Sequence, residues 1–336
     1  MLKYRVEPQV PVSDIIYITM PSPLSVAILR TLAYFDIFDY PLTVSELWRW
    51  LWPDPAQPVG EVTVEQVQQA LKFDELRGRV GMVDDYVVLT GREGIVKTRS
   101  DRQPANVRKW KRAESAARFL ELVPFVQLVA VSNTLAINNA RPESDIDFFI
   151  VTSGQHIWIA RFLVTGIISL LGWRRHGQKI TNRICLSFYI TTSALDLSPL
   201  KSAEPDPHFT FWVSQIVPLM DDDQTYEKFR AANPWVTATL PNAWKEASTG
   251  RVLAPNSSLC SIKKFYEVFF SSPIGIPIEN WTRNHQMKRF TNDTTGKSKE
   301  PGNDVIISED VLKFHEEDRR GKYNQKVGDR LKGLGL

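Results

Sequence analysis

The sequence predicts an α+β protein: a mixed central sheet with helices, preceded by a helical segment that ends in a hairpin and followed by a helical C-terminal region. Three apolar strands, at 125–131, 146–152 and 184–191, alternate with helical segments, which predicts the sheet. Apolar residues at helical spacing return from His208 onward, which predicts the C-terminal helices. The expected boundaries are 20–92, 93–123, 124–204 and 205–336.

Composition indicates a folded protein without covalent cross-links. Of its 336 residues, 43% are hydrophobic and 24% charged, which is typical of a chain that forms real cores. The formal net charge of +3 gives no reason to expect nucleic-acid binding over the whole surface. Two cysteines, Cys185 and Cys260, exclude a disulfide framework. With no signal-peptide pattern at the start, we expect a cytoplasmic protein.

The segment 20–92 combines helices with a hairpin. Three helices are expected, at 24–38, 44–52 and 63–76, and a hairpin at 80–90. Thr43 and Thr63 each begin a capping box, with Glu46 and Gln66 three residues later. This order of elements resembles a winged helix-turn-helix domain.

The third of these helices would read DNA in such a domain. It displays three acids, Glu65, Asp74 and Glu75, and one basic residue, Lys72, whereas DNA readers present an excess of Lys and Arg. Nucleic acid is therefore a weakly supported partner, and the alternative is a module for packing or dimerisation.

The segment 93–123 predicts a long helical connector. It is basic, with nine Lys or Arg against three acids between Arg92 and Arg118. Pro104 is expected to break this helix or to start a second one. Because the charges are spread along the segment, we favour a solvated helix face over a surface that meets a polyanion.

The most apolar helix, expected at 155–173, raises the question of a membrane. Its uninterrupted apolar stretch, 162–173, is 12 residues long. A bilayer span needs about 20 such residues, so we expect a buried helix and no membrane partner.

The C-terminal region is predicted to be helical with one polar interruption. The expected helices cover 209–220, 224–232, 235–244, 257–270, 281–290 and 308–331. A polar stretch rich in Gly, Lys and Ser at 291–303 predicts a loop.

Two aspartates at the start of the second central strand indicate the chemistry. Because side chains alternate along a strand, Asp145 and Asp147 share one face, while Ile146 and Phe148 point into packing. Two carboxylates a few Å apart repel each other, so a divalent cation between them is favoured. Mg²⁺ prefers carboxylate oxygens completed by triphosphate oxygens and water. The pair therefore predicts a Mg²⁺ site, with both aspartates as ligands, for a nucleoside triphosphate.

The stretch 131–152 resembles the nucleotidyltransferase superfamily, in particular its polymerase beta-like and minimal bacterial members. The family carries a Gly-Ser pair at a strand-to-helix turn and, after a spacer, an Asp-x-Asp strand. The matching positions here are Asn133, Thr134, Ala136, Asn138, Ala140 and Ser144-Asp145-Ile146-Asp147. The resemblance implies that Asn133, Thr134 and Ser144 contact the nucleotide. It also implies transfer of a nucleoside monophosphate from a triphosphate to a hydroxyl acceptor.

Four positions in the turn depart from this pattern, and one of them, Asn138, stands where the family has its second glycine. Asn133 stands where the family has glycine, and Asn adopts the left-handed backbone more readily than most residues. Thr134 keeps the hydroxyl of the family's serine. Ile137 stands where the family has arginine.

The third carboxylate of active family members is missing from its strand. The strand at 184–191 contains no acid, and Ser187 is the polar residue in its middle. We take Asp196 as the third catalytic acid, with Asp206 and the run 221–223 as alternatives. The run also fits a helix N-cap with a solvated first turn, and Asp196 fits a loop acid.

Basic residues precede the third strand and either meet phosphates or solubilise a loop. They are Arg174, Arg175, His176, Lys179 and Arg183.

The sequence thus leaves three functions open. The first is a Mg²⁺-dependent nucleotidyltransferase, and the second is a catalytically inactive relative that regulates through nucleotide binding or its winged domain. The third is a DNA-binding repressor.

Overall fold

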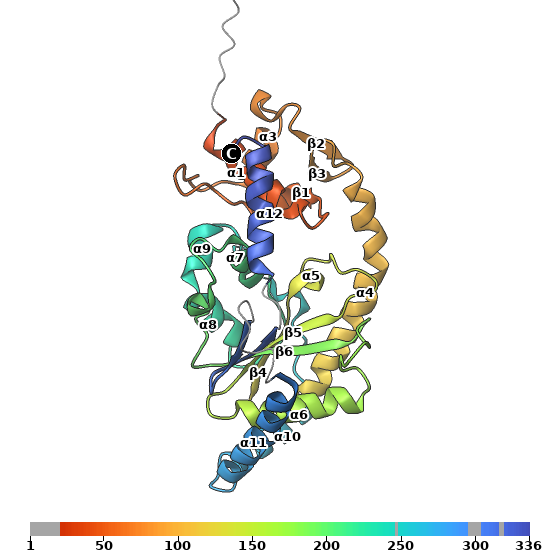
Figure 1. Ribbon diagram of the computed structural model, residues 1–336, viewed down its shortest axis with the longest axis vertical. Coiled ribbons are helices and arrows are strands. Elements are labelled where there is room, and N and C mark those ends of the chain that lie inside the picture. The colour runs from red at the N-terminus through yellow and green to blue at the C-terminus, as the bar shows by residue number, and fades with distance from the viewer. Residues whose placement is uncertain (1–20, 246–247, 295–303, 316–318) are drawn as a thin grey trace, which may run out of the picture.

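The computed structural model describes residues 21–245, 248–294, 304–315 and 319–336. Within them it confirms the α+β class, with twelve α-helices, a three-stranded antiparallel sheet near the N-terminus and a six-stranded mixed sheet (Figure 1).

The N-terminal unit, residues 21–92, contains the three predicted helices and the predicted hairpin, although the second and third helices are shorter than expected and a short strand precedes the second. Its elements are α1 (Pro23–Asp36), β1 (Leu42–Thr43), α2 (Val44–Arg49), α3 (Val64–Ala70), a 3₁₀ turn at Asp74–Leu76, β2 (Val80–Val83) and β3 (Tyr86–Leu89). The strands pair in the order β1-β3-β2. Both capping boxes are present, at Thr43 and at Thr63. Each satisfies backbone N–H groups that a helix start otherwise leaves unpaired.

The connector is a single helix, α4 (Ile95–Leu120), that runs from the N-terminal unit to the main sheet (Figure 1). The interruption expected at Pro104 is wrong, because the helix continues through it. The expectation that the basic residues of this helix form a solvated face is also wrong in part. Lys109 is fully buried and Arg102 is 8% exposed, and both donate hydrogen bonds to neighbouring loops.

The main sheet has the strand order β7-β4-β5-β6-β9-β8. The strands are β4 (Val126–Val131), β5 (Ile146–Thr152), β6 (Ile184–Thr191), β7 (Val217–Asp221), β8 (Asp304–Ile307) and β9 (Val311–His315). Only β5 and β6 pair in parallel, so these two strands start at the same edge of the sheet. The three strands expected from the sequence are therefore confirmed as its centre.

The C-terminal region is less helical than predicted, since it supplies the three outer strands. The helix expected at 209–220 is instead α7 (Pro207–Ser214) followed by β7. Pro218 would break a helix, whereas an edge strand such as β7 tolerates it. The helix expected at 308–331 is instead β9 followed by α12 (Arg320–Gly333). Here the hairpin β8–β9 pairs with the free edge of β6.

The other expected C-terminal helices are present with shifted ends. They are α8 (Thr225–Ala232), α9 (Pro234–Thr239), α10 (Ser257–Phe270) and α11 (Gly275–Thr294), with 3₁₀ turns at Ser198–Leu200 and Ser248–Arg251. Of the polar loop predicted at 291–303, the first four residues belong to α11 and the rest lie outside the described residues.

The main sheet is covered on both faces. Alternate residues of β5 enter two cores: Phe148 and Ile150 pack with α4 and with α6 (Ile157–Leu170), and Phe149 packs with α7 and α8. The buried helix expected at 155–173 is thus α6, which packs beneath the sheet. In the described part of the chain, no helix has the length and apolar character needed to cross a membrane.

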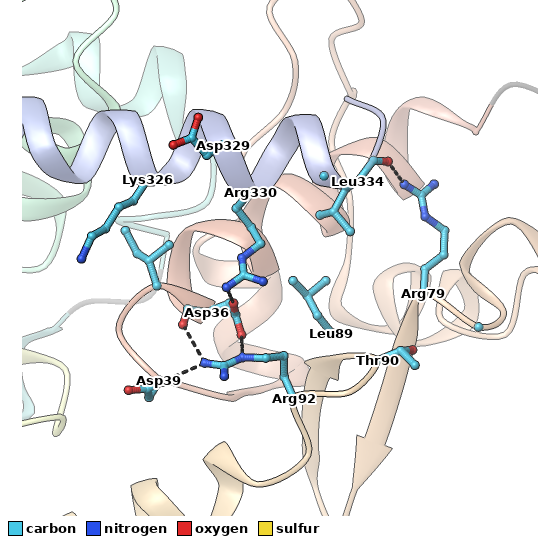
Figure 2. A pocket seen from close by; sticks show the side chains of 13 residues that line it. Asp36, Asp39, Arg79, Leu89, Thr90, Arg92, Lys326, Asp329, Arg330 and Leu334 are labelled. Carbon is cyan, nitrogen blue, oxygen red and sulfur yellow. Dashed lines mark hydrogen bonds and ion pairs between the residues drawn. The ribbon is translucent and has the colours of Figure 1, made fainter.

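Helix α12 leads from the sheet back to the N-terminal unit (Figure 1). At this seam Asp36, 2% exposed, accepts from Arg92 Nε at 2.5 Å and pairs with Arg330 Nη2 at 2.7 Å (Figure 2). An open cavity of about 920 Å³ lies between the two parts, and these charges line it. The acids and arginines that line the cavity pair largely with one another and so connect the N-terminal unit to α12. Asp145 and Asp147 are not among the residues that line it.

Candidate metal and nucleotide site

The aspartate pair lies where the sheet meets the loop before β5. From β4 the chain passes through Ser132 into the short helix α5 (Asn133–Ala136), then through a loop to Asp145 and the start of β5. Ile146 and Phe148 are buried in the core, at 0% and 1% exposure. The prediction that the two aspartates share the opposite face is confirmed, because their carboxylate oxygens come within 4.8 Å of each other.

A third side chain joins the pair, and it is a thiol. In the parallel pairing, Cys185 of β6 lies opposite Asp147 of β5. Its sulfur and one oxygen from each aspartate all lie within 4.8 Å of one another. Sequence reasoning missed Cys185 because it looked for an acid on this strand. The alternation that groups the aspartates also places Cys185 on the face of Ser187, to whose Oγ the thiol donates at 3.3 Å.

The site carries a concentrated negative charge that one arginine partly neutralises. Burial raises the pKa of Asp147 to about 7, and the nearby charge of Asp145 adds to this effect. A hydrogen bond from the Asn133 side chain and the charge of Arg175 act in the opposite direction. Arg175 Nη1 donates to Asp145 Oδ2 at 2.6 Å. Burial, followed by the charge of Asp147, also raises the pKa of Cys185 to about 12, so the thiol is protonated at neutral pH.

The turn before the pair uses two asparagines in the left-handed conformation. Asn133 has φ +59° and Asn138 has φ +57°, a region that most residues with a side chain avoid. The expectation that Asn133 adopts the left-handed backbone is therefore confirmed. Its Oδ1 accepts from Trp212 Nε1 at 2.7 Å, so the side chain connects α7 to the site.

The other two predicted nucleotide-binding residues differ in their availability. Thr134 is exposed, and the structure leaves its side chain facing solvent on α5. The Ser144 hydroxyl donates to the Arg141 carbonyl at 3.0 Å, and its own carbonyl accepts from Lys109 and from the Asn182 backbone. Ser144 therefore shapes the loop that presents Asp145.

Helix α4 holds this loop from behind. Lys109 Nζ donates to Ser144 O at 2.6 Å, to Pro142 O at 3.1 Å and to Asn182 Oδ1 at 2.8 Å. Asn106 donates to Asn138 O at 2.6 Å, and its Oδ1 accepts from the Ala140 amide at 2.9 Å. The basic connector thus fixes the position of the aspartates, a role that its charge pattern alone did not indicate.

The acids proposed to complete the site lie elsewhere. Because β5 and β6 are parallel, Asp196, which follows the end of β6, is roughly 20 Å of strand away from the pair. Its carboxylate accepts from Ser198 N and Oγ, both at 2.8 Å. The prediction of Asp196 as third acid is corrected accordingly: it closes a local turn.

The two alternatives also have structural partners. Asp206 is buried and caps α7 by accepting from Phe209 N at 3.2 Å. In the run 221–223, Asp221 accepts from Tyr226 N at 3.0 Å in the first turn of α8, as the capping interpretation predicts. Asp222 pairs with Lys263.

One of the five basic residues before β6 reaches the aspartates, namely Arg175. His176 and Lys179 bond each other through their backbones in an exposed loop, and the Arg183 carbonyl accepts from Ile146 N at 2.8 Å. Arg175 is 44% exposed, so it is free to reorient toward a bound anion.

Comparison with family models, curated proteins and solved structures found no match to this chain. The functional assignment therefore rests on the residues and on their geometry.

Proposed function

We propose that the chain binds a nucleoside triphosphate with Mg²⁺ at Asp145 and Asp147 and transfers its nucleoside monophosphate to a hydroxyl acceptor. The acceptor oxygen would bond to the α-phosphorus, the bond to the β-phosphate oxygen would break, and pyrophosphate would leave with the hydroxyl proton passing to water. When bound, Mg²⁺ supplies charge neutralisation for the triphosphate and for this transfer.

One observation carries the proposal: the carboxylate pair follows a turn whose two asparagines, Asn133 and Asn138, occupy the family's glycine positions with left-handed backbone. A chance Asp-x-Asp on a strand does not require such a turn. The order of β4, α5 and β5, with β6 parallel to β5, further supports a nucleotidyltransferase-type fold.

The surroundings of the pair suggest how a triphosphate is held. Two carboxylates within 4.8 Å fit a divalent cation. Arg175 pairs with Asp145, and a cation there would release its guanidinium to meet phosphate oxygens. The exposed hydroxyl of Thr134 lies on the helix that follows β4 and would donate to the same phosphates.

We further infer that the N-terminal unit is winged-helix-like. Support comes from the element order α1-β1-α2-α3-β2-β3 and from the three-stranded sheet in the order β1-β3-β2. The unit would act as a rigid module that α4 and α12 attach to the catalytic part. The segment 63–76, which contains α3, carries more acids than basic residues, so DNA binding receives little support.

The test is transfer of label from each of the four α-labelled triphosphates, with Mg²⁺, onto the protein and onto a panel of hydroxyl acceptors. The double variant Asp145→Asn/Asp147→Asn should lose the transfer. Asp196→Asn is the matched control, because this acid lies at the other end of β6 and its loss should leave transfer unchanged. Equal transfer by wild type and double variant would contradict the proposal.

A second candidate is a nucleotide-binding regulator without transferase activity. It is favoured by Cys185, which stands beside the pair where an active site of this type needs a third carboxylate. Under this alternative, triphosphate binds with Mg²⁺ and the double variant loses binding, while no acceptor receives label.

A further inference from the structure

Helix α10 faces the protein with its polar side. Lys263 is 4% exposed and donates to the Val126 carbonyl and to the Asp222 carboxylate. Glu267, one turn later, accepts from the Phe125 amide at 2.9 Å. The charged residues of this helix therefore attach it to the edge of the main sheet, which is the reverse of an ordinary surface helix.

The apolar side of α10 faces outward. Ile262, Phe265, Tyr266 and Phe269 follow the spacing i, i+3, i+4, i+7 and so form one stripe along the helix. They are 43%, 68%, 42% and 42% exposed, and Val268 beside them is 75% exposed. In the described part of the chain, nothing packs over this stripe.

Helix α11 is also attached to the protein through polar side chains. Glu279 accepts from the amides of Trp158 and Ile159, both at 2.9 Å, at the start of α6. Further along, Gln286 bonds Arg161 and the Trp158 carbonyl. The outward surface of α11 is mixed: Ile276 and Trp281 are 65% and 57% exposed, and the exposed residues that follow Trp281 include Arg283 and Asn284. The uncovered apolar surface therefore consists of the α10 stripe and the first part of α11.

The turn that joins the helices continues this surface. Residues 268–278 contain no charged side chain, and Ile274 and Ile276 are 57% and 65% exposed. Gly275 allows the close turn, because a Cβ there would fall 1.5 Å from the Phe270 carbonyl oxygen. The hairpin lies at the end of the molecule opposite the N-terminal unit, where a partner has open access (Figure 1).

The area of this surface matches one half of a stable protein interface. Eight large apolar or aromatic residues are 42–75% exposed on the hairpin. At about 200 Å² for each of the four aromatic side chains and about 150 Å² for each of the four Ile and Val residues, their exposed fractions amount to roughly 800 Å². A standard interface uses about 800 Å² per partner, and the largest patch on a typical monomer is about 300–600 Å².

We propose that α10 and α11 form a homodimer interface, in which the hairpins of two copies pack against each other. A stripe at this spacing interdigitates with another helix, and a two-fold axis pairs the stripe with itself. A lipid surface fits less well, because interfacial helices carry Lys and Arg on their polar face. Here that face is used inside the protein, and Lys264 is the one exposed basic residue between 258 and 282.

The test is sedimentation of the full chain at micromolar concentration, for wild type and for the Phe265→Asp/Phe269→Asp variant. The wild type should sediment as a dimer of the 38.4 kDa chain and the variant as a monomer with unchanged circular dichroism. Phe73→Asp, which alters a 44% exposed phenylalanine on the N-terminal unit, is the matched control and should remain dimeric. A monomeric wild type, or a double variant that is still dimeric, would overturn the proposal.

A second measurement does not depend on the charged variant folding. In a Cys260→Ser background, Tyr266→Cys should form a disulfide-linked dimer under mild oxidation, whereas Met82→Cys on the N-terminal unit should not. Equal cross-linking at both positions would overturn the proposal. So would a monomeric wild type that floats with phosphatidylcholine–phosphatidylglycerol vesicles, an outcome that assigns the hairpin to lipid.

Discussion

Cys185 lies directly opposite Asp147 in the parallel pairing of β6 with β5, and its sulfur belongs to the same cluster as the two carboxylates. A thiol here changes what the cluster binds. Carboxylate oxygens suit Mg²⁺, whereas a thiolate selects softer cations such as Zn²⁺ and Cd²⁺. Because burial and, to a lesser degree, the charge of Asp147 raise the pKa of the thiol and keep it protonated, Mg²⁺ would be bound by the two aspartates alone.

Substitution of Cys185 should therefore redirect metal preference. Cys185→Asp supplies the missing third carboxylate and should strengthen Mg²⁺ binding on the order of tenfold. Cys185→Ser should leave Mg²⁺ binding nearly unchanged and weaken Cd²⁺ binding by a similar factor. Titration calorimetry with each cation measures both effects. Equal Cd²⁺ affinity in wild type and Cys185→Ser would show that the sulfur is not a ligand.

The raised pKa of Asp147 predicts a pH-dependent stability. An aspartate in the unfolded chain ionises near pH 4, but folding holds Asp147 protonated up to about pH 7. The folded state thus loses stability as pH rises from about 4 to 7. Asp147→Asn removes this loss and should stabilise the protein by about 4 kcal/mol at pH 8 and hardly at all at pH 4. Denaturant unfolding at both pH values checks it, and a pH-independent difference would contradict it.

The left-handed backbone at Asn138 predicts that substitution of this residue destabilises the protein. Alanine at φ +57° is strained by about 1 kcal/mol, and the buried Trp110 Nε1, which donates to Asn138 Oδ1 at 2.7 Å, would lose its acceptor at about 1 kcal/mol more. The free energy of unfolding of the Asn138→Ala variant should therefore be about 2 kcal/mol lower than that of the wild type. Asn138→Asp, which keeps the acceptor and tolerates this backbone, should lose much less. Similar losses in both variants would mean that the turn does not depend on this residue.

Lys109 should matter for the site although it lies behind it. Lys109→Met leaves the oxygens of Ser144, Pro142 and Asn182 without their donor, which should destabilise the protein by about 2–4 kcal/mol. Mg²⁺ affinity should fall as the loop before Asp145 loosens. Lys111→Met, on the exposed side of the same helix, is the control and should change neither quantity. Thermal unfolding with and without Mg²⁺ separates the two effects.

Local pattern was enough to predict the centre of the fold. The strands β4, β5 and β6 and the capping boxes at Thr43 and Thr63 depend on spacing and short-range hydrogen bonds. The outer strands could not be predicted this way. Five apolar residues before Asp221 fit either a helix or a strand, and the choice depends on a free edge of β4 more than 80 residues earlier.

The candidate site likewise combines features that local sequence pattern predicts with features that depend on tertiary structure. The convergence of Asp145 and Asp147 follows from alternation along one strand, so sequence could predict it. The neighbour of Asp147 depends on the register between two strands, which placed Cys185 there and Asp196 at the far end. The role of Lys109 depends on how α4 crosses the loop, and a basic helix pattern contains no information about that crossing.

The most direct test of the central claim is calorimetric titration of ATP, GTP, CTP and UTP, each with and without Mg²⁺. We expect at least one triphosphate to bind the wild type and Asp196→Asn only when Mg²⁺ is present, and to bind Asp145→Asn/Asp147→Asn not at all. Binding of no triphosphate, or equal binding to wild type and the double variant, would contradict the assignment of this site.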